Sequence, residues 1–317
     1  MVNCKICDKE FSDDTSLHRH LRAHSIRKVE YYQTHFPRYD LHTGDIIKFK
    51  SKEQYFSSDF NSRLSLKHWL KKQDPEKSKK YCHKILQDRI EKKSITYCPS
   101  QVELRTIMSP PTQYYDVLFG NFYDYCKENF KLNSKFKKIS NILFENNIWK
   151  IKSKFQEPIV YVDTREQMPL KFKECEIRVK TLPFGDYCFF DNEHTHNCYV
   201  ERKSIKDFIG TLSGGFERFE REIIRCQEAD SYLVVLVERN LNECMAFKKL
   251  PYVSKKVRAT PEYIFSNVRT LIQKYPYLQF LFVNGRKESV RVMEKMFFTG
   301  TDYKNYDLQL AYDLKIL

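Results

Sequence analysis

Long apolar runs are absent from this sequence of 317 residues. No stretch of about 18 uncharged apolar residues occurs, which is the length that a membrane-spanning helix needs. The N-terminus, MVNCKICDKE, has no apolar segment of the kind that directs secretion. Apart from Cys4 and Cys7, the 10 cysteines are scattered singly, which is not the pattern of a disulfide framework. We therefore expect an intracellular protein with reduced cysteines and no membrane span.

Glycine is also scarce, with 8 residues, and we draw no function from that bias. Positive charge is plentiful and unevenly placed. Residues 1–158 contain 30 Lys and Arg against 19 Asp and Glu, whereas residues 159–317 contain 25 against 22, within a net charge of +14. A basic N-terminal half suggests attraction to a polyanion such as nucleic acid. A solvated basic surface is the simpler alternative, and charge alone favours it. Hydrophobic residues make up 41%, which is ample for a packed core.

A strong metal-ligand pattern lies at the N-terminus, in NCKICDKEFSDDTSLHRHLRAH at residues 3–24. Two thiolates and two imidazoles one helical turn apart can hold one zinc ion in a closed tetrahedral site, with the ligands Cys4, Cys7, His20 and His24. Phe11 and Leu17 would form a small core that needs the metal to fold. The spacing resembles the two-Cys two-His zinc-finger family, which implies a small ββα unit at residues 1–25.

The partner of this finger is left open by the sequence. Asp13, Ser16 and Arg19 stand where a DNA-reading finger contacts bases, and Arg19 is our candidate for a nucleic-acid contact. A single finger covers about three base pairs, and the acidic pair Asp13–Asp14 opposes phosphate binding. Docking of a protein, binding of RNA and a purely structural role are the alternatives. We expect His18 at the surface.

Residues 26–155 match no family that we can name and predict a mainly helical, basic region. Apolar spacing predicts a helix at 75–92, and dense aromatics predict another at 112–130. Residues 131–155 contain seven lysines and one glutamate with aromatics between them. Lys135, Lys137 and Lys138 are therefore candidates for DNA contacts. The alternative is an amphipathic helix that buries the aromatics, followed by a linker.

From residue 159 short apolar runs alternate with helical stretches. We expect strands at 159–163, 176–180, 186–190, 197–203, 232–237 and 278–283. Helices are expected at 215–229, 261–275 and 286–298. The alternation predicts an α/β domain with a mixed central sheet over residues 156–300. Residues 301–317 would form a C-terminal tail.

Acidic residues stand at the ends of these expected strands. Asp163 ends the first strand, Asp186 follows Phe184-Gly185, and Glu201-Arg202-Lys203 closes another strand. Carboxylates bind a hard cation such as magnesium and leave coordination positions for water and phosphate. Lys203 would share a face with Glu201 because strand side chains repeat every two residues. By itself this D…ExK pattern is weak, because chance matches are common in a chain with 30% charged residues.

The match extends further than these residues. VDTRE at 162–166, LPFGDY at 182–187 and VERKSIKDF at 200–208 resemble, in order and spacing, the nuclease signature of the XPF/Hef/MUS family. The segment from Gly214 to Phe219, with Glu222 and Arg225 after it, resembles the next helix of that domain. The resemblance covers residues 159–298. It implies a restriction-endonuclease-like fold of the PD-(D/E)XK superfamily.

The resemblance also implies a role for each matching residue. Asp186 and Glu201 would be the principal ligands of magnesium or manganese, with Asp163 as a third carboxylate, direct or through water. Lys203 would be the catalytic lysine. Supporting roles would fall to Arg165, Glu166, Arg202, Asp207 and Arg218. We expect His194 and His196 in an exposed turn.

We therefore expect a DNA endonuclease that cuts at a branch, flap or single-strand/double-strand junction in repair, recombination or DNA processing. It would act in the nucleus or at a site of DNA replication if the source is eukaryotic or viral. About 19 residues follow position 298, too few for the paired helix-hairpin-helix elements of many family members, so a homodimer or heterodimer through the nuclease domain is left open. The alternatives are a non-catalytic DNA-binding or scaffold subunit and a zinc-finger regulator. Inactive family members typically lose the acidic or lysine positions, whereas this sequence keeps them.

Overall fold

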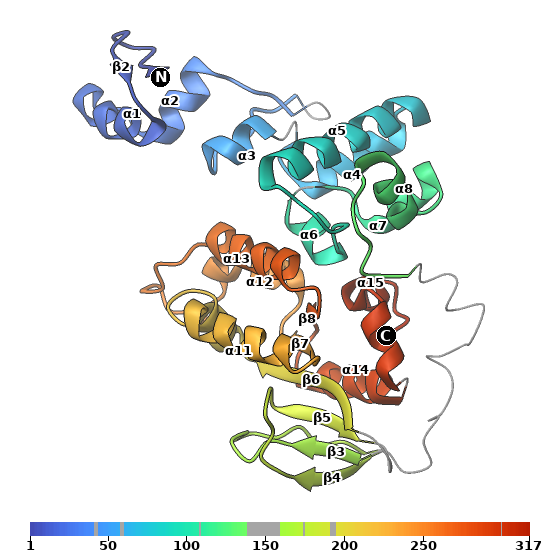
Figure 1. Ribbon diagram of the computed structural model, residues 1–317. Helices are drawn as coiled ribbons and strands as arrows, with labels where there is room; N and C mark the ends of the chain where they lie inside the picture. The colour runs from blue at the N-terminus through green and yellow to red at the C-terminus, as the bar shows by residue number, and fades with distance from the viewer. Residues whose placement is uncertain are drawn as a thin grey trace. The chain divides into compact units, whose positions relative to one another are not determined.

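The computed structural model describes residues 1–40, 44–57, 60–107, 109–137, 159–173, 175–190, 195–298 and 300–317. The chain forms two compact units (Figure 1). The first comprises Met1–His83 with Ser109 and Pro110, and the second comprises Lys84–Ile107 with Pro111–Leu317. In the described residues, no helix combines the length and the apolar character that crossing a membrane requires.

The first unit begins with an antiparallel hairpin of β1 (Val2–Asn3) and β2 (Glu10–Phe11), followed by α1 (Asp14–His20) and the short 3-10 helix η1 (Leu21–His24). Asp13 caps α1, because its carboxylate accepts a hydrogen bond of 2.8 Å from the N–H of Ser16. The other helices of this unit are α2 (Lys28–His35), α3 (Lys52–Ser57), α4 (Arg63–Lys72) and the start of α5 (Pro75–Lys93).

The finger-like segment does not have a core of its own. Leu17 and Leu21 pack in one buried cluster with Tyr31 and Tyr32 of α2, and the same cluster continues to Ile47, Phe49 and Tyr55. The hydroxyl of Tyr31 accepts a hydrogen bond of 3.0 Å from the N–H of Lys5 in the hairpin. The core of the predicted finger thus reaches about thirty residues past position 25.

Helices α6 (Gln101–Thr106), α7 (Thr112–Phe119) and α8 (Phe122–Phe130) belong to the second unit. The single helix predicted at 112–130 is two helices. Gly120 adopts φ 89°, which ends α7, and the side chain of Asn121 then caps α8 by accepting from the N–H of Tyr123 at 3.0 Å. The helix predicted at 75–92 corresponds to α5.

A six-stranded sheet forms the centre of the second unit. Its strands are β3 (Ile159–Val162), β4 (Glu176–Val179), β5 (Tyr187–Phe190), β6 (Thr195–Lys203), β7 (Tyr232–Val237) and β8 (Leu278–Phe282), in the order β4-β3-β5-β6-β7-β8. β5 is antiparallel to both of its neighbours, and all other pairs are parallel. The carboxyl ends of β3, β6, β7 and β8 therefore lie along one edge. The predicted α/β fold with a mixed sheet is confirmed.

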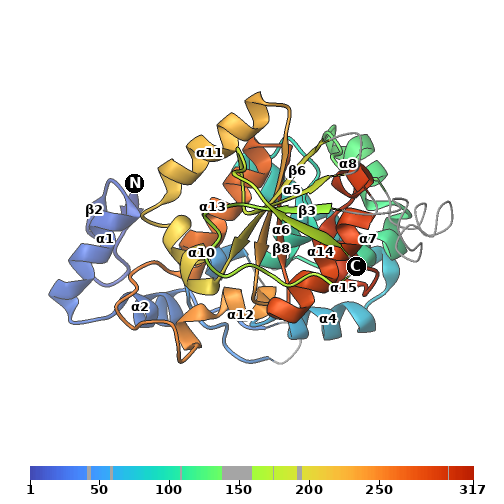
Figure 2. The same cartoon turned by 90° about the horizontal axis from the view of Figure 1, so that it is seen from below.

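Helices cover both faces of this sheet (Figures 1 and 2). One face carries α10 (Ile205–Thr211), α11 (Phe216–Glu228), α12 (Leu241–Met245) and α13 (Pro261–Lys274). The other carries α14 (Arg286–Phe298), the 3-10 helix η3 (Gly300–Asn305) and α15 (Leu308–Asp313). Every residue of β7 is buried, because alternate side chains enter the two cores, which explains its unbroken apolar sequence YLVVLV.

Two domain boundaries differ from those that the sequence suggests. Residues 301–317 are not a tail, because Tyr303, Leu308 and Leu310 are buried against the sheet. Gln309 also accepts a hydrogen bond of 2.9 Å from the N–H of Phe282 in β8. The helical region predicted as one body at 26–155 is divided between the two units. Residues 138–158 and His194 lie outside the described residues.

Candidate active site

Gly185 allows the loop before β5 to approach β6 closely. It adopts φ 58°, and a Cβ atom at this position would lie 2.9 Å from the carbonyl oxygen of Val200. The next residue, Asp186, donates its N–H to the same carbonyl at 2.9 Å and accepts from the N–H of Asp163 at 2.8 Å. The Gly-Asp pair therefore joins the ends of β3 and β6 at the carboxyl edge of the sheet.

At this edge the half-buried carboxylate of Asp186 lies near the buried carboxylate of Glu201. One oxygen of Asp186 accepts from the N–H of Arg202 at 2.7 Å, and its other oxygen has no protein partner within the described residues. Burial, followed by the charge of Glu201, raises the pKa of Asp186 to about 7. Burial also raises the pKa of Glu201, which is 9% exposed. Because each negative charge opposes the other, a bound cation would relieve both.

Lys203 completes this group from the same face of β6. Its ammonium donates to a carboxylate oxygen of Glu201. The Nζ atom also lies 5.8 Å from the centre of the Phe219 ring, which α11 places beneath it. One ammonium and two carboxylates thus meet over the ends of two strands, as the alternation of strand side chains predicts for Glu201 and Lys203.

Asp163 lies beside this group but its oxygens are occupied. One oxygen accepts from the N–H and the Nε of Arg165, both at 2.7 Å, and the other accepts from Arg165 at 3.0 Å and from the N–H of Leu182 at 2.7 Å. Burial opposes ionisation, but these hydrogen bonds hold the pKa of Asp163 below its usual value. In this arrangement Asp163 is not available as a direct metal ligand. It instead fixes Arg165, whose side chain is 68% exposed.

Arg202 points to the opposite face of β6 and connects three strand ends. Its guanidinium donates twice to Glu166, at 2.9 Å each, and once to Glu238 at 3.1 Å. Arg286 of α14 lies 3.6 Å from the second oxygen of Glu238. Glu166 and Arg202, predicted as supporting residues, are therefore a structural brace of the edge. Glu238 was missed, although an acid directly after a buried strand is the signal that identified Asp163.

Residues 162–296 of the chain match the model of the ERCC4 domain family. This stretch is therefore similar to the ERCC4 domain, and we call it the ERCC4-like region. The family consists of structure-specific DNA nuclease domains, and the match includes the predicted residues Asp163, Asp186, Glu201 and Lys203. No curated protein matches the chain.

Two solved structures resemble this part of the chain. They are XPF from Aeropyrum pernix and XPF from Aeropyrum pernix in complex with DNA, each 22% identical with a TM-score of 0.33. The matches cover 44% and 45% of this chain and 64% of the XPF chain in each case. The chain therefore spans less than two thirds of the length of these relatives.

Helices α10 and α11 supply the other predicted residues of the ERCC4-like region. Asp207 accepts from the hydroxyl of Ser204 at 2.5 Å and belongs to the cap of α10. Arg218 is exposed on α11 and has no partner within the described residues. Glu222, to which the sequence analysis gave no role, follows Phe219 by one helical turn. After burial, the charge of Glu222 also raises the pKa of Glu201, so this carboxylate lies near the site.

The predicted zinc ligands gather in the first unit, apart from the ERCC4-like region in sequence. Sγ of Cys7 lies 3.2 Å from Nε2 of His20, and Sγ of Cys4 lies 3.6 Å from Nε2 of His24. The ligand atoms of all four residues lie within 4.8 Å of one another. Tetrahedral zinc places such atoms about 3.3–3.8 Å apart, so the donor set fits the metal. Among the described residues, the carboxylates of the ERCC4-like region do not form a group of three such ligands.

The positions of the finger that were predicted to contact nucleic acid are not all available for it. Arg19 is exposed on α1, but Asp13 and Ser16, the other base-reading positions, bond to each other in the cap of that helix. His18, expected at the surface, is half-buried: its Nε2 lies 3.0 Å from the hydroxyl of Tyr32 and its ring packs against the tyrosine.

Lys135 is poorly placed for DNA. Its ammonium bonds to the carbonyl of Ile272 and lies 4.6 Å from the centre of the Tyr97 ring, inside the second unit. The interpretation of this lysine as a phosphate contact is therefore wrong for this structure. Lys137 is exposed, and Lys138 lies outside the described residues.

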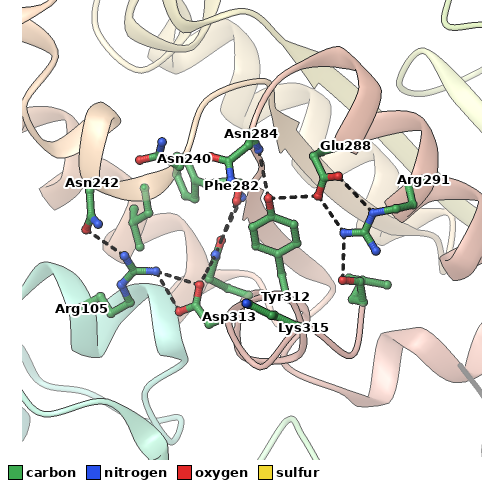
Figure 3. Close-up of a pocket in the computed structure, with 13 residues that line it drawn as sticks. Arg105, Asn240, Asn242, Phe282, Asn284, Glu288, Arg291, Tyr312, Asp313 and Lys315 are labelled. Atoms are coloured by element: carbon green, nitrogen blue, oxygen red, sulfur yellow. Dashed lines mark hydrogen bonds and ion pairs between the residues drawn. The ribbon is translucent and has the colours of Figure 1, made fainter.

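A polar pocket of about 630 Å³ opens at the carboxyl ends of β7 and β8 (Figure 3). Arg105 of α6 donates to both oxygens of Asp313 at 2.8 and 2.9 Å, and Arg291 donates to Glu288 at 2.7 Å. Arg105 also reaches the side-chain oxygen of Asn242 at 2.8 Å. The bonds of Arg105 connect α6 to α15 and α12, whereas Arg291 and Glu288 both belong to α14. None of the predicted catalytic residues lines this pocket.

Proposed function

We propose that the chain is a metal-dependent DNA endonuclease that hydrolyses phosphodiester bonds at branched, flap or single-strand/double-strand junction DNA. The observation that carries this proposal is the meeting of Asp186, Glu201 and Lys203 at one edge of the sheet, within the region that is similar to the ERCC4 domain. The same domain match supports DNA as the partner. We propose that this activity serves DNA repair, recombination or DNA processing, and that the protein acts where the DNA is located.

Asp186 and Glu201 are the proposed ligands of magnesium or manganese. Both offer carboxylate oxygen, and one oxygen of Asp186 has no protein partner among the described residues. Magnesium takes few protein carboxylates and keeps several waters, which suits a pair of carboxylates better than a closed cage. The cation, when bound, supplies positive charge that offsets the negative charge developing on the phosphate.

Lys203 is the proposed catalytic lysine. Its ammonium is held by Glu201 over the Phe219 ring, so it has one preferred position before the substrate arrives. A preorganised cation can orient the attacking water or stabilise the transition state without further rearrangement. Asp163 is proposed to act through Arg165, whose exposed guanidinium it fixes beside the site, and Arg218 is proposed to contact the DNA backbone.

Cleavage by the purified full chain tests this function. Labelled flap, fork, nicked and linear DNAs are incubated with magnesium, and we expect cutting near the junctions that chelation abolishes. Asp186→Asn, Glu201→Gln and Lys203→Ala should each lower the rate at least about a hundredfold. Glu217→Gln on α11, an exposed acid of the same domain, is the control and should cut like the wild type.

Two results would contradict the proposal. Wild-type rates in all three variants would remove these residues from the chemistry. A wild-type chain that binds the junction DNAs and cuts none of them, with either cation, would favour the alternative of a non-catalytic DNA-binding subunit.

We further propose that Cys4, Cys7, His20 and His24 bind one zinc ion. Zinc analysis of the full chain tests this directly, with one equivalent expected. A Cys7→Ser variant that holds as much zinc as the wild type would contradict it.

A further inference from the structure

The turn between α4 and α5 carries a dense group of lysines. Helix α4 ends with Lys71 and Lys72, and α5 starts at Pro75 after a connection of two residues. Lys77 and Lys80 lie in the first two turns of α5. We call these four lysines the hairpin lysines. All four are exposed.

The acidic residues of this turn are already engaged. Asp74 accepts from the N–H of Glu76 at 2.7 Å and thus caps the start of α5. Glu76 pairs with a different lysine, Lys79, at 2.9 Å. None of the four hairpin lysines has a hydrogen bond or ion pair within the described part of the chain. Four positive charges are therefore left without a protein partner.

The hairpin that carries these lysines is a packed structure. Phe60, Trp69 of α4 and Tyr81 of α5 pack ring against ring, with centroids 5.2–5.7 Å apart. Leu66, Leu70 and Cys82 are buried beneath the two helices. The lysine-bearing turn is thus held by a core on the opposite side of each helix, and the N-terminal end of α5 adds the partial positive charge of its peptide dipoles.

We infer that the turn between α4 and α5 is a binding site for the phosphate backbone of duplex DNA. Unpaired lysines on a fixed turn match closely spaced phosphates, and each phosphate neutralised releases a counterion, which makes the contact favourable at low salt. Residues 71–80 hold five lysines against the two acids Asp74 and Glu76, so the turn keeps a surplus of positive charge. This inference rests on the proposed function only for its choice of DNA as the polyanion.

Duplex binding in the absence of cleavage tests the site. All measurements use the full chain with a chelator present, so the result does not depend on the catalytic residues. The variant Lys71→Gln, Lys72→Gln, Lys77→Gln, Lys80→Gln should flatten the log–log salt slope by up to about 3.6, since each phosphate contact contributes about 0.9. When the salt concentration rises from 50 to 200 mM, the affinity of the wild type should therefore fall by a factor roughly a hundredfold larger than that of this variant.

Two matched variants separate a site from a general charge effect. The same four positions changed to Arg keep the charge and should keep the wild-type slope. Gln at the exposed lysines Lys127, Lys171, Lys173 and Lys287 changes the net charge equally and should change the slope by less than about one.

A hairpin variant with the wild-type slope, or a slope reduced equally in both Gln variants, overturns the inference. Preference for single-stranded RNA over duplex DNA by the wild-type chain, lost in the hairpin variant, would also overturn it and assign the turn to RNA. If Asp186→Asn loses cleavage but the four-lysine Gln variant keeps the wild-type salt slope, the nuclease assignment is intact and only this site is refuted.

Discussion

At Gly185 one missing side chain decides how close two carboxylates lie. The residue has a positive φ and approaches the backbone of β6 more closely than any Cβ atom would allow. Asp186 follows directly and is held by Val200 and Arg202 beside Glu201. The high pKa of Asp186 is a consequence, since burial and the neighbouring charge both oppose its ionisation.

Gly185→Ala should therefore disturb both stability and activity. The new Cβ atom would meet backbone and not a movable side chain, and φ 58° is costly for alanine. We expect a loss of about 1–3 kcal/mol in the free energy of unfolding, together with reduced cleavage. Urea unfolding measures the first. Gly210→Ala in α10, where a Cβ atom meets nothing within 4 Å, is the control and should not destabilise the protein. Equal stability of both variants would show that the close approach at Gly185 is not needed.

The hydrogen bonds of Asp163 separate its role from that of Glu201. If Asp163 fixes Arg165 and does not hold the cation, Asp163→Asn should lower cleavage at least about tenfold and leave manganese affinity within about threefold of the wild type. Glu201→Gln should lose manganese affinity at least tenfold, because it removes a proposed ligand charge. Calorimetric titration with manganese distinguishes the two. A loss of affinity in Asp163→Asn as large as in Glu201→Gln would make Asp163 a ligand after all.

Among the elements, the segment after α8 shows how packing can reverse the meaning of a charge. Lys135 extends towards α13, bonds to the carbonyl of Ile272 and lies near the buried Glu103. Burial lowers the pKa of Lys135 to about 8, and the charge of Glu103 only partly compensates. A lysine that reads as a phosphate contact in the sequence is thus a connection between two elements of one unit.

The pH dependence of unfolding should report this burial. Between pH 8 and pH 10.5 the unfolded chain binds a proton at Lys135 that the folded chain has released, so Lys135 makes the folded state more stable as pH rises through this window. The full shift corresponds to at most about 3 kcal/mol. Lys135→Met should lack this rise when its unfolding curve is compared with that of the wild type.

Lys127→Met, at an exposed position of α8, is the control and should follow the wild type at every pH. Parallel curves for Lys135→Met and the wild type between pH 8 and 10.5 would mean that the ammonium is solvated.

In the whole molecule, the two units have separate cores and should respond separately to loss of metal. The proposed zinc ligands belong to a core that includes Tyr31, Tyr32 and Phe49. The sheet of the second unit has its own cores on both faces. Removal of residues 1–25 would therefore expose aromatic core residues of the remaining chain and not merely delete a separate module.

Chelation of zinc should loosen the first unit well beyond the four ligands. Because metal binding and folding are coupled in such sites, we expect faster amide hydrogen exchange in residues 28–56 after chelation, with β7 still protected. Mass spectrometry of the full chain measures both, and added zinc should restore protection. Unchanged exchange in residues 28–56 would show that their core is independent of the finger, and exchange lost equally in β7 would show that the units unfold together.

Patterns that depend on neighbours in the sequence were predicted successfully. The six strands around residues 159–283 follow from apolar runs between polar breaks, and β7 is apolar throughout because both faces of the sheet are covered. The spacing of two residues places Glu201 and Lys203 on one face, and the spacing of Cys4, Cys7, His20 and His24 places four ligand atoms together. These results need only the geometry of a strand, a hairpin and a helical turn.

Only the tertiary structure decided the contacts between segments that are distant in the sequence. Nothing local shows that Arg165 and Leu182 saturate Asp163, that Arg202 joins Glu166 to Glu238, or that Ile272 receives Lys135. Nor does it show that residues 301–317 complete a core or that the hairpin lysines are without partners. The residue type determines which bonds a side chain can form, but packing decides which partners lie within bonding distance of it. The sequence therefore determined the chemistry present at the edge of the sheet, and the fold decided which of its charges are left free to act.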